Sequence, residues 1–182
     1  MKMFRKLKLL VATVVVNIVK RSESIYYTPE SNVSHMIQGG AIVGEDCHIY
    51  GQCRVDIPAL LKIGSNVTIS QNVRFLMHDA STKRDIGYSK VGKIVIGDNC
   101  FVGIDSTIMP GTVIGDNVIV GTSTVVRGKI PSNSVVVGNP GVVVCTKNDY
   151  IEKQRCYFEN EGHIEGSMDE FVESDRISGF TS

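Results

Sequence analysis

Tryptophan is absent from this chain of 182 residues, and the sequence has no excess of basic residues. The 19 Lys and Arg residues equal the 19 Asp and Glu residues, so the formal net charge is zero. Nucleic-acid-binding domains usually carry a strong basic excess, so this balance argues against that class. The five cysteines are odd in number and lack paired spacing, which argues against a disulfide framework and favours a reducing compartment.

A membrane-spanning run is also missing. Residues 1–21 carry six basic and no acidic side chains around an apolar run at residues 9–19, and that run is well short of the roughly 20 residues that a spanning helix needs. No small residues suited to signal cleavage follow it. We expect residues 1–25 to form a helix that packs on a subunit of a cytoplasmic protein, with peripheral membrane contact through residues 1–21 as the alternative.

The middle of the chain repeats every six residues, with an aliphatic or aromatic anchor at each repeat. Glycine follows the anchor at positions 97, 103, 115 and 121, and the residue four places after each anchor is mostly small. Two residues are inserted after the third anchor, and a longer break follows the sixth. The twelve anchors are Val43, Ile49, Val55, Ile63, Ile69, Phe75, Ile96, Val102, Ile108, Ile114, Val120 and Val126.

This pattern predicts an all-β solenoid with three short faces per coil, because neither a helical period of 3.6 nor a strand period of two explains a glycine after the anchor and a small residue four places on. The anchor fills a narrow prism and shares it with the small residue four places on, which is cysteine at positions 47, 53 and 100. Glycine or a small polar residue turns each corner, where a positive φ costs little for Gly, Asn or Asp. The solenoid is expected over residues 40–145.

The break after Phe75 predicts a loop over residues 78–92, which leaves the solenoid and begins with His78 and Asp79. Loops mounted on a rigid scaffold often carry function, and imidazole can take a proton from a hydroxyl group at neutral pH. An exposed histidine without a role is the competing interpretation. Asp79 and Asp56, which follows the anchor Val55, are the two candidates to orient the imidazole.

Three segments resemble the hexapeptide-repeat acyltransferases: residues 96–103 (IGDNCFVG), 108–117 (IMPGTVIGDN) and 137–141 (VGNPG). Within that group the chain looks most like the maltose, galactoside and polysaccharide O-acetyltransferases. The resemblance implies a left-handed parallel β-helix that works as a homotrimer, and Ile130-Pro131 with the Gly-Asn-Pro ending implies the coenzyme A-dependent branch. The chain departs from the family where Phe101-Val102-Gly103 replaces Trp-Ile-Gly.

The same resemblance implies acetyl-CoA as the acyl donor and a catalytic histidine at the opening of the loop, which is His78 here. Backbone near Gly103, Ile104, Thr122 and Ser123 would meet the thioester and the pantetheine arm. Arg127 and Lys129 would lie near the coenzyme phosphates. Asn139 and Pro140 complete the expected coenzyme-binding residues.

We therefore expect an acetyl-CoA-dependent O-acetyltransferase that acts on a sugar or glycan hydroxyl. Transfer to an amino sugar or to serine, and a non-catalytic binding scaffold, remain alternatives. No metal site is expected, because the remaining histidines lack ligand-like spacing. Residues 146–182 are expected to form a C-terminal helix and an acidic tail, since residues 157–182 carry seven acids against one arginine.

Overall fold

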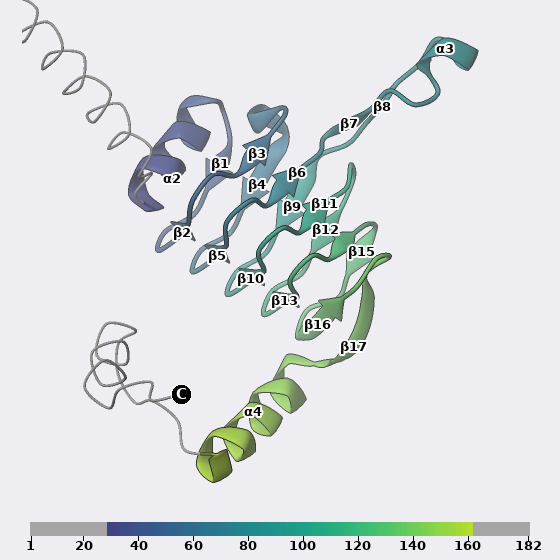
Figure 1. Ribbon diagram of the computed structural model, residues 1–182. Coiled ribbons are helices and arrows are strands. Elements are labelled where there is room, and N and C mark those ends of the chain that lie inside the picture. The colour runs from purple at the N-terminus through teal and green to yellow at the C-terminus, as the bar shows by residue number, and fades with distance from the viewer. Residues whose placement is uncertain (1–28, 162–182) are drawn as a thin grey trace, which may run out of the picture. The chain divides into compact units, whose positions relative to one another are not determined.

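The computed structural model describes residues 29–161, so the expected helix over residues 1–25 and the acidic residues 162–182 lie outside the described part of the chain. Figure 1 shows short strands stacked coil upon coil into a prism with three faces. The first face orders its strands as β1 (Ile42–Val43), β4 (Leu61–Ile63), β9 (Ile94–Ile96), β12 (Val113–Ile114) and β15 (Lys129–Ile130).

On the other two faces the strands also stack in chain order along the prism. The second face contains β2 (His48–Ile49), β5 (Thr68–Ile69), β10 (Phe101–Val102), β13 (Ile119–Val120), β16 (Ser134–Val137) and β17 (Val142–Thr146). The third face contains β3 (Arg54–Val55), β6 (Arg74–Phe75), β11 (Thr107–Ile108) and β14 (Val125–Val126). All pairings within these faces are parallel except the antiparallel pair of β16 and β17. The predicted solenoid is confirmed.

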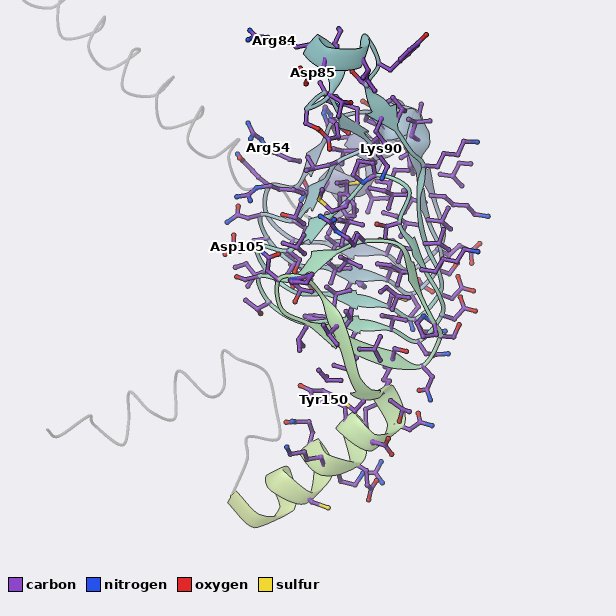
Figure 2. All side chains as sticks on the ribbon, turned by 90° about the vertical axis from the view of Figure 1, so that its right-hand side faces the viewer. Arg54, Arg84, Asp85, Lys90, Asp105 and Tyr150 are labelled. Carbon is purple, nitrogen blue, oxygen red and sulfur yellow. The ribbon has the colours of Figure 1, made fainter. Side chains whose placement is uncertain are left out.

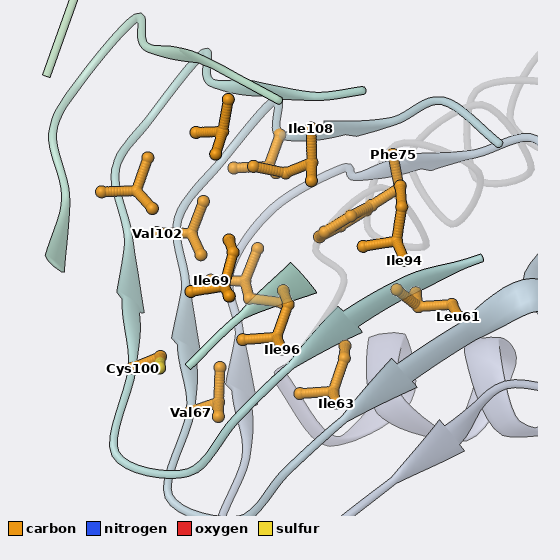
Figure 3. Close-up of a cluster of buried hydrophobic side chains, with 14 of the residues drawn as sticks. Leu61, Ile63, Val67, Ile69, Phe75, Ile94, Ile96, Cys100, Val102 and Ile108 are labelled. Carbon is orange, nitrogen blue, oxygen red and sulfur yellow. The ribbon is translucent and has the colours of Figure 1, made fainter. Parts of the chain in front are cut away.

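The six-residue period sets the register between coils. On the third face Val55 pairs with Phe75, Phe75 with Ile108, and Ile108 with Val126, so anchor stacks on anchor. Ten of the twelve anchors are buried, and Val43 and Val55 of the first coil are half-buried. Figure 3 shows anchors of successive coils inside the prism, among them Ile69, Val102 and Ile108. The inserted residues after β3 form a short 3-10 turn over Pro58–Leu60.

The small residues four places after the anchors share this interior. Ser106, Thr112 and Thr124 are buried, and each side-chain hydroxyl donates a hydrogen bond to a backbone carbonyl. Cys100 is also buried, and its Sγ atom lies 3.2 Å from the carbonyl oxygen of Gly115. Burial raises the pKa of the Cys100 thiol above its ordinary value, as expected for a cysteine that fills space inside the prism.

The corner glycines have a different role from the one expected. Gly97 and Gly115 do not adopt a positive φ; the left-handed residues lie two places later, where Asn99 and Asn117 both have φ of 57°. Glycine follows the anchor because the corners of successive coils are in contact. A Cβ atom on Gly97 would lie 2.7 Å from the carbonyl carbon of Gly115, which is backbone and cannot move aside.

Helix α2 (Pro29–Gln38) precedes the first coil and is fixed to it by a buried asparagine. The side-chain amide nitrogen of Asn32 donates to the carbonyl oxygens of Ile49 and Gly51, each at 2.7 Å. Strand β17 ends the sheet at the other end of the prism. Helix α4 (Lys147–Glu161) lies almost entirely in a second structural unit that begins at Asn148. Between residues 29 and 161 no helix combines the length and apolar character needed to cross a membrane.

Candidate active site

The loop expected over residues 78–92 leaves the prism after β6, as Figure 1 shows. Strands β7 (His78–Asp79) and β8 (Lys90–Val91) pair antiparallel, and helix α3 (Lys83–Ile86) lies at the tip of this ribbon. The backbone N–H of Gly92 donates to the carbonyl oxygen of Met77 at 2.8 Å and closes the base of the loop. Met77 is fully buried, so His78 is the first exposed side chain beyond the prism.

His78 contacts Asp56, one of its two expected partners. The Nδ1 atom of the imidazole lies 2.6 Å from Oδ2 of the carboxylate. The other carboxylate oxygen, Oδ1, accepts a hydrogen bond from the backbone N–H of Met77 at 2.8 Å. Asp56 is therefore held at both oxygens, and only 21% of its side chain is exposed against 51% for His78.

The contact with Asp56 selects which ring nitrogen of His78 carries the proton in the neutral imidazole. A carboxylate beside Nδ1 holds the proton on that nitrogen, which leaves the lone pair on Nε2. Among residues 29–161 no other group hydrogen-bonds the imidazole of His78, and half of its side chain is exposed. A neutral imidazole with an accessible Nε2 and a fixed carboxylate on Nδ1 can act as a general base and stabilise the cation that forms.

Asp79, the other expected partner, forms no hydrogen bond or ion pair with the imidazole of His78. Its carboxylate accepts a hydrogen bond from the backbone N–H of Ser81 at 2.9 Å, which shapes the loop and lowers the pKa of Asp79 below its ordinary value. Asp79 instead lines a groove of about 510 Å³ with Lys90, Pro110 and Arg127. The groove places an acidic and two basic side chains together at the corner between the third and first faces.

The residues expected to bind the coenzyme occupy two corners of the prism. Gly103, Ile104, Thr122 and Ser123 stack at the corner between the second and third faces, where the N–H of Ser123 donates to the carbonyl oxygen of Ile104 at 2.8 Å. Asn139 and Pro140 follow β16 at the same corner in the last coil. Arg127 lies at the other corner with Asp79, and Lys129 begins the first-face strand β15.

At the corner between the second and third faces, one backbone N–H group in each of two stacked coils has no partner among the described residues. At the corner between the first and second faces, the equivalent N–H groups of Ser65, Asp98 and Asp116 donate to side-chain oxygens. Within the described residues the N–H groups of Ile104 and Thr122 donate to nothing. Two stacked, unpaired donors at an exposed turn are suited to an amide or thioester carbonyl of a ligand.

Sequence reasoning named both residues of the His78–Asp56 pair but missed the N–H of Met77, which anchors the carboxylate. The usable signal was the position of Asp56, directly after an anchor on the coil that stacks beneath the start of the loop. The described residues contain no cluster of three or more His, Cys, Asp or Glu residues positioned to hold a metal ion.

Comparisons with known proteins match the repeats and the fold of this chain. Residues 93–128 match the family model described as bacterial transferase hexapeptide, six repeats. The galactoside O-acetyltransferase of Escherichia coli K12 is 33% identical over 111 residues, which are 58% of this chain and 52% of that protein. The chain spans about half the length of the curated relatives that it matches.

Two solved structures share the fold. A maltose O-acetyltransferase from Clostridium difficile 630 superposes with a TM-score of 0.50 and 28% identity over 64% of this chain and 75% of that one. A galactoside acetyltransferase in complex with coenzyme A gives 0.51 and 25% identity over 68% and 73%. The fold and the repeats define a left-handed parallel β-helix. The resemblance to the hexapeptide-repeat acyltransferases is confirmed.

Proposed function

We propose that this protein is an O-acetyltransferase that moves the acetyl group of acetyl-CoA to a hydroxyl of a sugar or a polysaccharide precursor. The observation that carries the proposal is the 2.6 Å contact between His78 and Asp56 at the base of the extruded loop. The similarity to galactoside and maltose O-acetyltransferases supports the donor and the class of acceptor.

In this mechanism Nε2 of His78 takes the proton of the acceptor hydroxyl as its oxygen attacks the thioester carbonyl. The carbon–sulfur bond breaks when the tetrahedral intermediate collapses, and the imidazolium returns the proton to the departing thiolate. Asp56 stabilises the imidazolium and keeps the ring oriented, because its second oxygen is fixed by the N–H of Met77.

The donor would bind along the corner between the second and third faces. The unpaired N–H groups of Ile104 and Thr122 are suited to its carbonyl groups, with Gly103, Ser123, Asn139 and Pro140 at the same corner. Arg127 and Lys129 would pair with the coenzyme phosphates. Because Arg127 lies at a different corner, we propose a homotrimer in which each site combines the His78 corner of one subunit with the donor corner of the next.

Subunit mixing tests this arrangement. We expect His78→Ala and Thr122→Pro each to be inactive, and a refolded mixture of the two to recover part of the activity, since a mixed trimer contains one intact shared site. Sedimentation equilibrium gives the oligomeric mass, and thermal unfolding confirms that both variants fold. A monomeric mass, or no recovery from well-folded mixed trimers, would contradict the shared site.

We also propose that the protein acts in the cytoplasm and that residues 1–21 contact a subunit. Deletion of residues 1–21 is then expected to lower thermal stability or to loosen the trimer. Salt-sensitive co-sedimentation of the full chain with anionic liposomes, lost on deletion, would instead show peripheral membrane contact at the inner face of the membrane.

Mass spectrometry of an acceptor panel tests the activity itself. Glucose, maltose, galactosides and acidic sugars are incubated with the protein and acetyl-CoA, with glucosamine included as an amine-bearing acceptor and serine as an acceptor through its hydroxyl or its amine. We expect a gain of one acetyl group on a sugar hydroxyl with wild-type protein, and at least about a hundredfold slower product formation with His78→Ala. Transfer to amines alone would favour N-acetylation, and the absence of any transfer would favour a binding scaffold.

A further inference from the structure

Two arginines lie side by side on the third face of the prism. Arg54 on β3 and Arg74 on β6 are direct register partners in a parallel pair, and both are exposed. Figure 2 shows Arg54 pointing away from the prism, with Asp105 further along the same side. Within the described residues neither guanidinium forms an ion pair, with Asp105 or with any other carboxylate.

This arrangement is unfavourable without a ligand. Neighbouring strands lie about 4.8 Å apart, and like charges directly opposite each other on a sheet are destabilising. Guanidinium groups bind carboxylate and phosphate oxygens through two parallel N–H donors, so two adjacent arginines can enclose one anionic group. An anion between Arg54 and Arg74 would replace their repulsion with two charge-assisted contacts.

The arginine pair lies beside the candidate catalytic pair. Arg54 precedes Asp56 by two residues, and Arg74 precedes His78 by four along the same two chain segments. Two residues of extended chain span about 7 Å, which is of the order of one sugar ring. The four residues from Arg74 to His78 span about 13 Å, so an anion held by the arginines would lie one to two sugar units from a hydroxyl that reaches His78.

The position along the prism separates this pair from the proposed donor site. Arg54 and Arg74 belong to the first two coils, before the extruded loop. The donor residues Gly103, Ile104 and Thr122 follow the loop, in coils further along the prism. Along the prism of one subunit His78 lies between the two sets, so the arginine pair is distinct in position from the proposed donor residues.

From this geometry we infer that Arg54 and Arg74 form an anion subsite for the acceptor, and that the preferred acceptor is an acidic sugar carrying a carboxylate or a phosphate near the acetylated hydroxyl. The prediction about acetylation of acidic sugars rests on the proposed function. The prediction that the two arginines bind an anion does not depend on catalysis.

The experiment uses three probes that share one ring: glucose, glucuronate and glucose 1-phosphate. Equilibrium binding of each to the full-length protein is measured by ligand-observed NMR, and acetylation is followed with saturating acetyl-CoA. Arg54→Gln and Arg74→Gln remove one charge each, and Arg74→Lys keeps the charge but removes the planar fork. Lys62→Gln is the matched control, because Lys62 is an exposed cation on the first face of the second coil.

We expect at least one acidic probe to bind at least tenfold more tightly than glucose and to be acetylated with at least tenfold higher kcat/KM. Each Arg→Gln change is expected to lower the acidic-to-neutral ratio at least tenfold, Arg74→Lys to lower it less, and Lys62→Gln to leave it unchanged. Preference for glucuronate over glucose 1-phosphate identifies a carboxylate acceptor, and the reverse identifies a phosphate.

Equal binding of neutral and acidic probes would overturn the subsite, whether or not acetylation occurs. A rise in the KM for acetyl-CoA in the Arg→Gln variants, with an unchanged acidic-to-neutral ratio, would assign the arginines to the donor instead and also overturn it. Selective binding of acidic probes without acetyl transfer would uphold the subsite and refute the proposed function.

Discussion

The Nδ1 atom of His78 lies 2.6 Å from Oδ2 of Asp56, although 22 residues separate the two side chains in the sequence. The contact is made by the stacking of two coils: Val55 pairs with Phe75, which brings the residues that follow each anchor to the same corner. Because Asp56 also accepts from the N–H of Met77, the carboxylate is held to the backbone of the residue that directly precedes His78.

Removal of either member of this pair is expected to slow turnover. His78→Ala should lower kcat at least about a hundredfold, which is the usual contribution of a general base. Asp56→Asn should lower kcat at least about tenfold with little change in the KM for acetyl-CoA, because the amide no longer stabilises the imidazolium. Steady-state kinetics on folded variants measure both effects.

Asp85→Asn is the matched control, since it removes an exposed carboxylate from the helix at the tip of the same loop. It is expected to keep near wild-type kinetics. Near wild-type turnover of His78→Ala would refute the assignment of the base, and an equal loss in Asp85→Asn would point to a general effect of loop charge.

The interior position of Cys100 should tolerate only small side chains. Cys100→Leu is expected to destabilise the fold by roughly 1–3 kcal/mol through overpacking, and Cys100→Ala by less. The reason is that Cys100 is 3% exposed and lies beneath the backbone of the next coil, 3.2 Å from the carbonyl oxygen of Gly115. Denaturant midpoints compare the variants, and equal midpoints for Leu and Ala would contradict tight packing there.

Substitution of two glycines compares the cost of a steric clash, at Gly97, with the cost of backbone strain, at Gly87. Gly97→Ala places a Cβ atom 2.7 Å from the carbonyl carbon of Gly115, so the coils must move apart, at an expected cost of about 2–4 kcal/mol. Gly87 has φ of 78° but open space around it, so Gly87→Ala should cost only about 1–2 kcal/mol. Chemical denaturation of both variants tests the order, and a smaller loss for Gly97→Ala would contradict the close approach of the corners.

The rate of cysteine alkylation should be lower for a thiol that is more buried. Desolvation raises the pKa of the Cys53 thiol to about 11, so at pH 8 about one molecule in a thousand carries the reactive thiolate. Cys156 is exposed. We expect iodoacetamide to label Cys156 well before Cys53 in the native protein, and the Cys53 rate to rise with pH up to about 11. Peptide mass spectrometry gives the order, and equal native rates would contradict the burial of Cys53.

The repeat was predictable from sequence because each six-residue unit carries its own signal. Anchors such as Ile96 and Ile114, and small residues four places after an anchor such as Cys100, can be recognised from the local pattern without knowledge of distant contacts. The role of Gly97 was mistaken because the sequence shows that a small residue is required and not whether φ or a neighbouring coil requires it. The choice between Asp56 and Asp79 depended on side-chain directions: Asp79 turns back to Ser81, while coil stacking brings Asp56 to His78.

A stack of identical coils has no inherent reason to stop, since each end presents a full set of unpaired strand edges to any other copy of the chain. The amide of Asn32 occupies the carbonyl oxygens of Ile49 and Gly51 at one end, and the reversed direction of β17 breaks the parallel pattern at the other. Both features cover a strand edge that another copy of the chain could otherwise extend. Loss of the Asn32 contacts would leave the carbonyl oxygens of Ile49 and Gly51 free to accept from a second chain, in addition to weakening the fold.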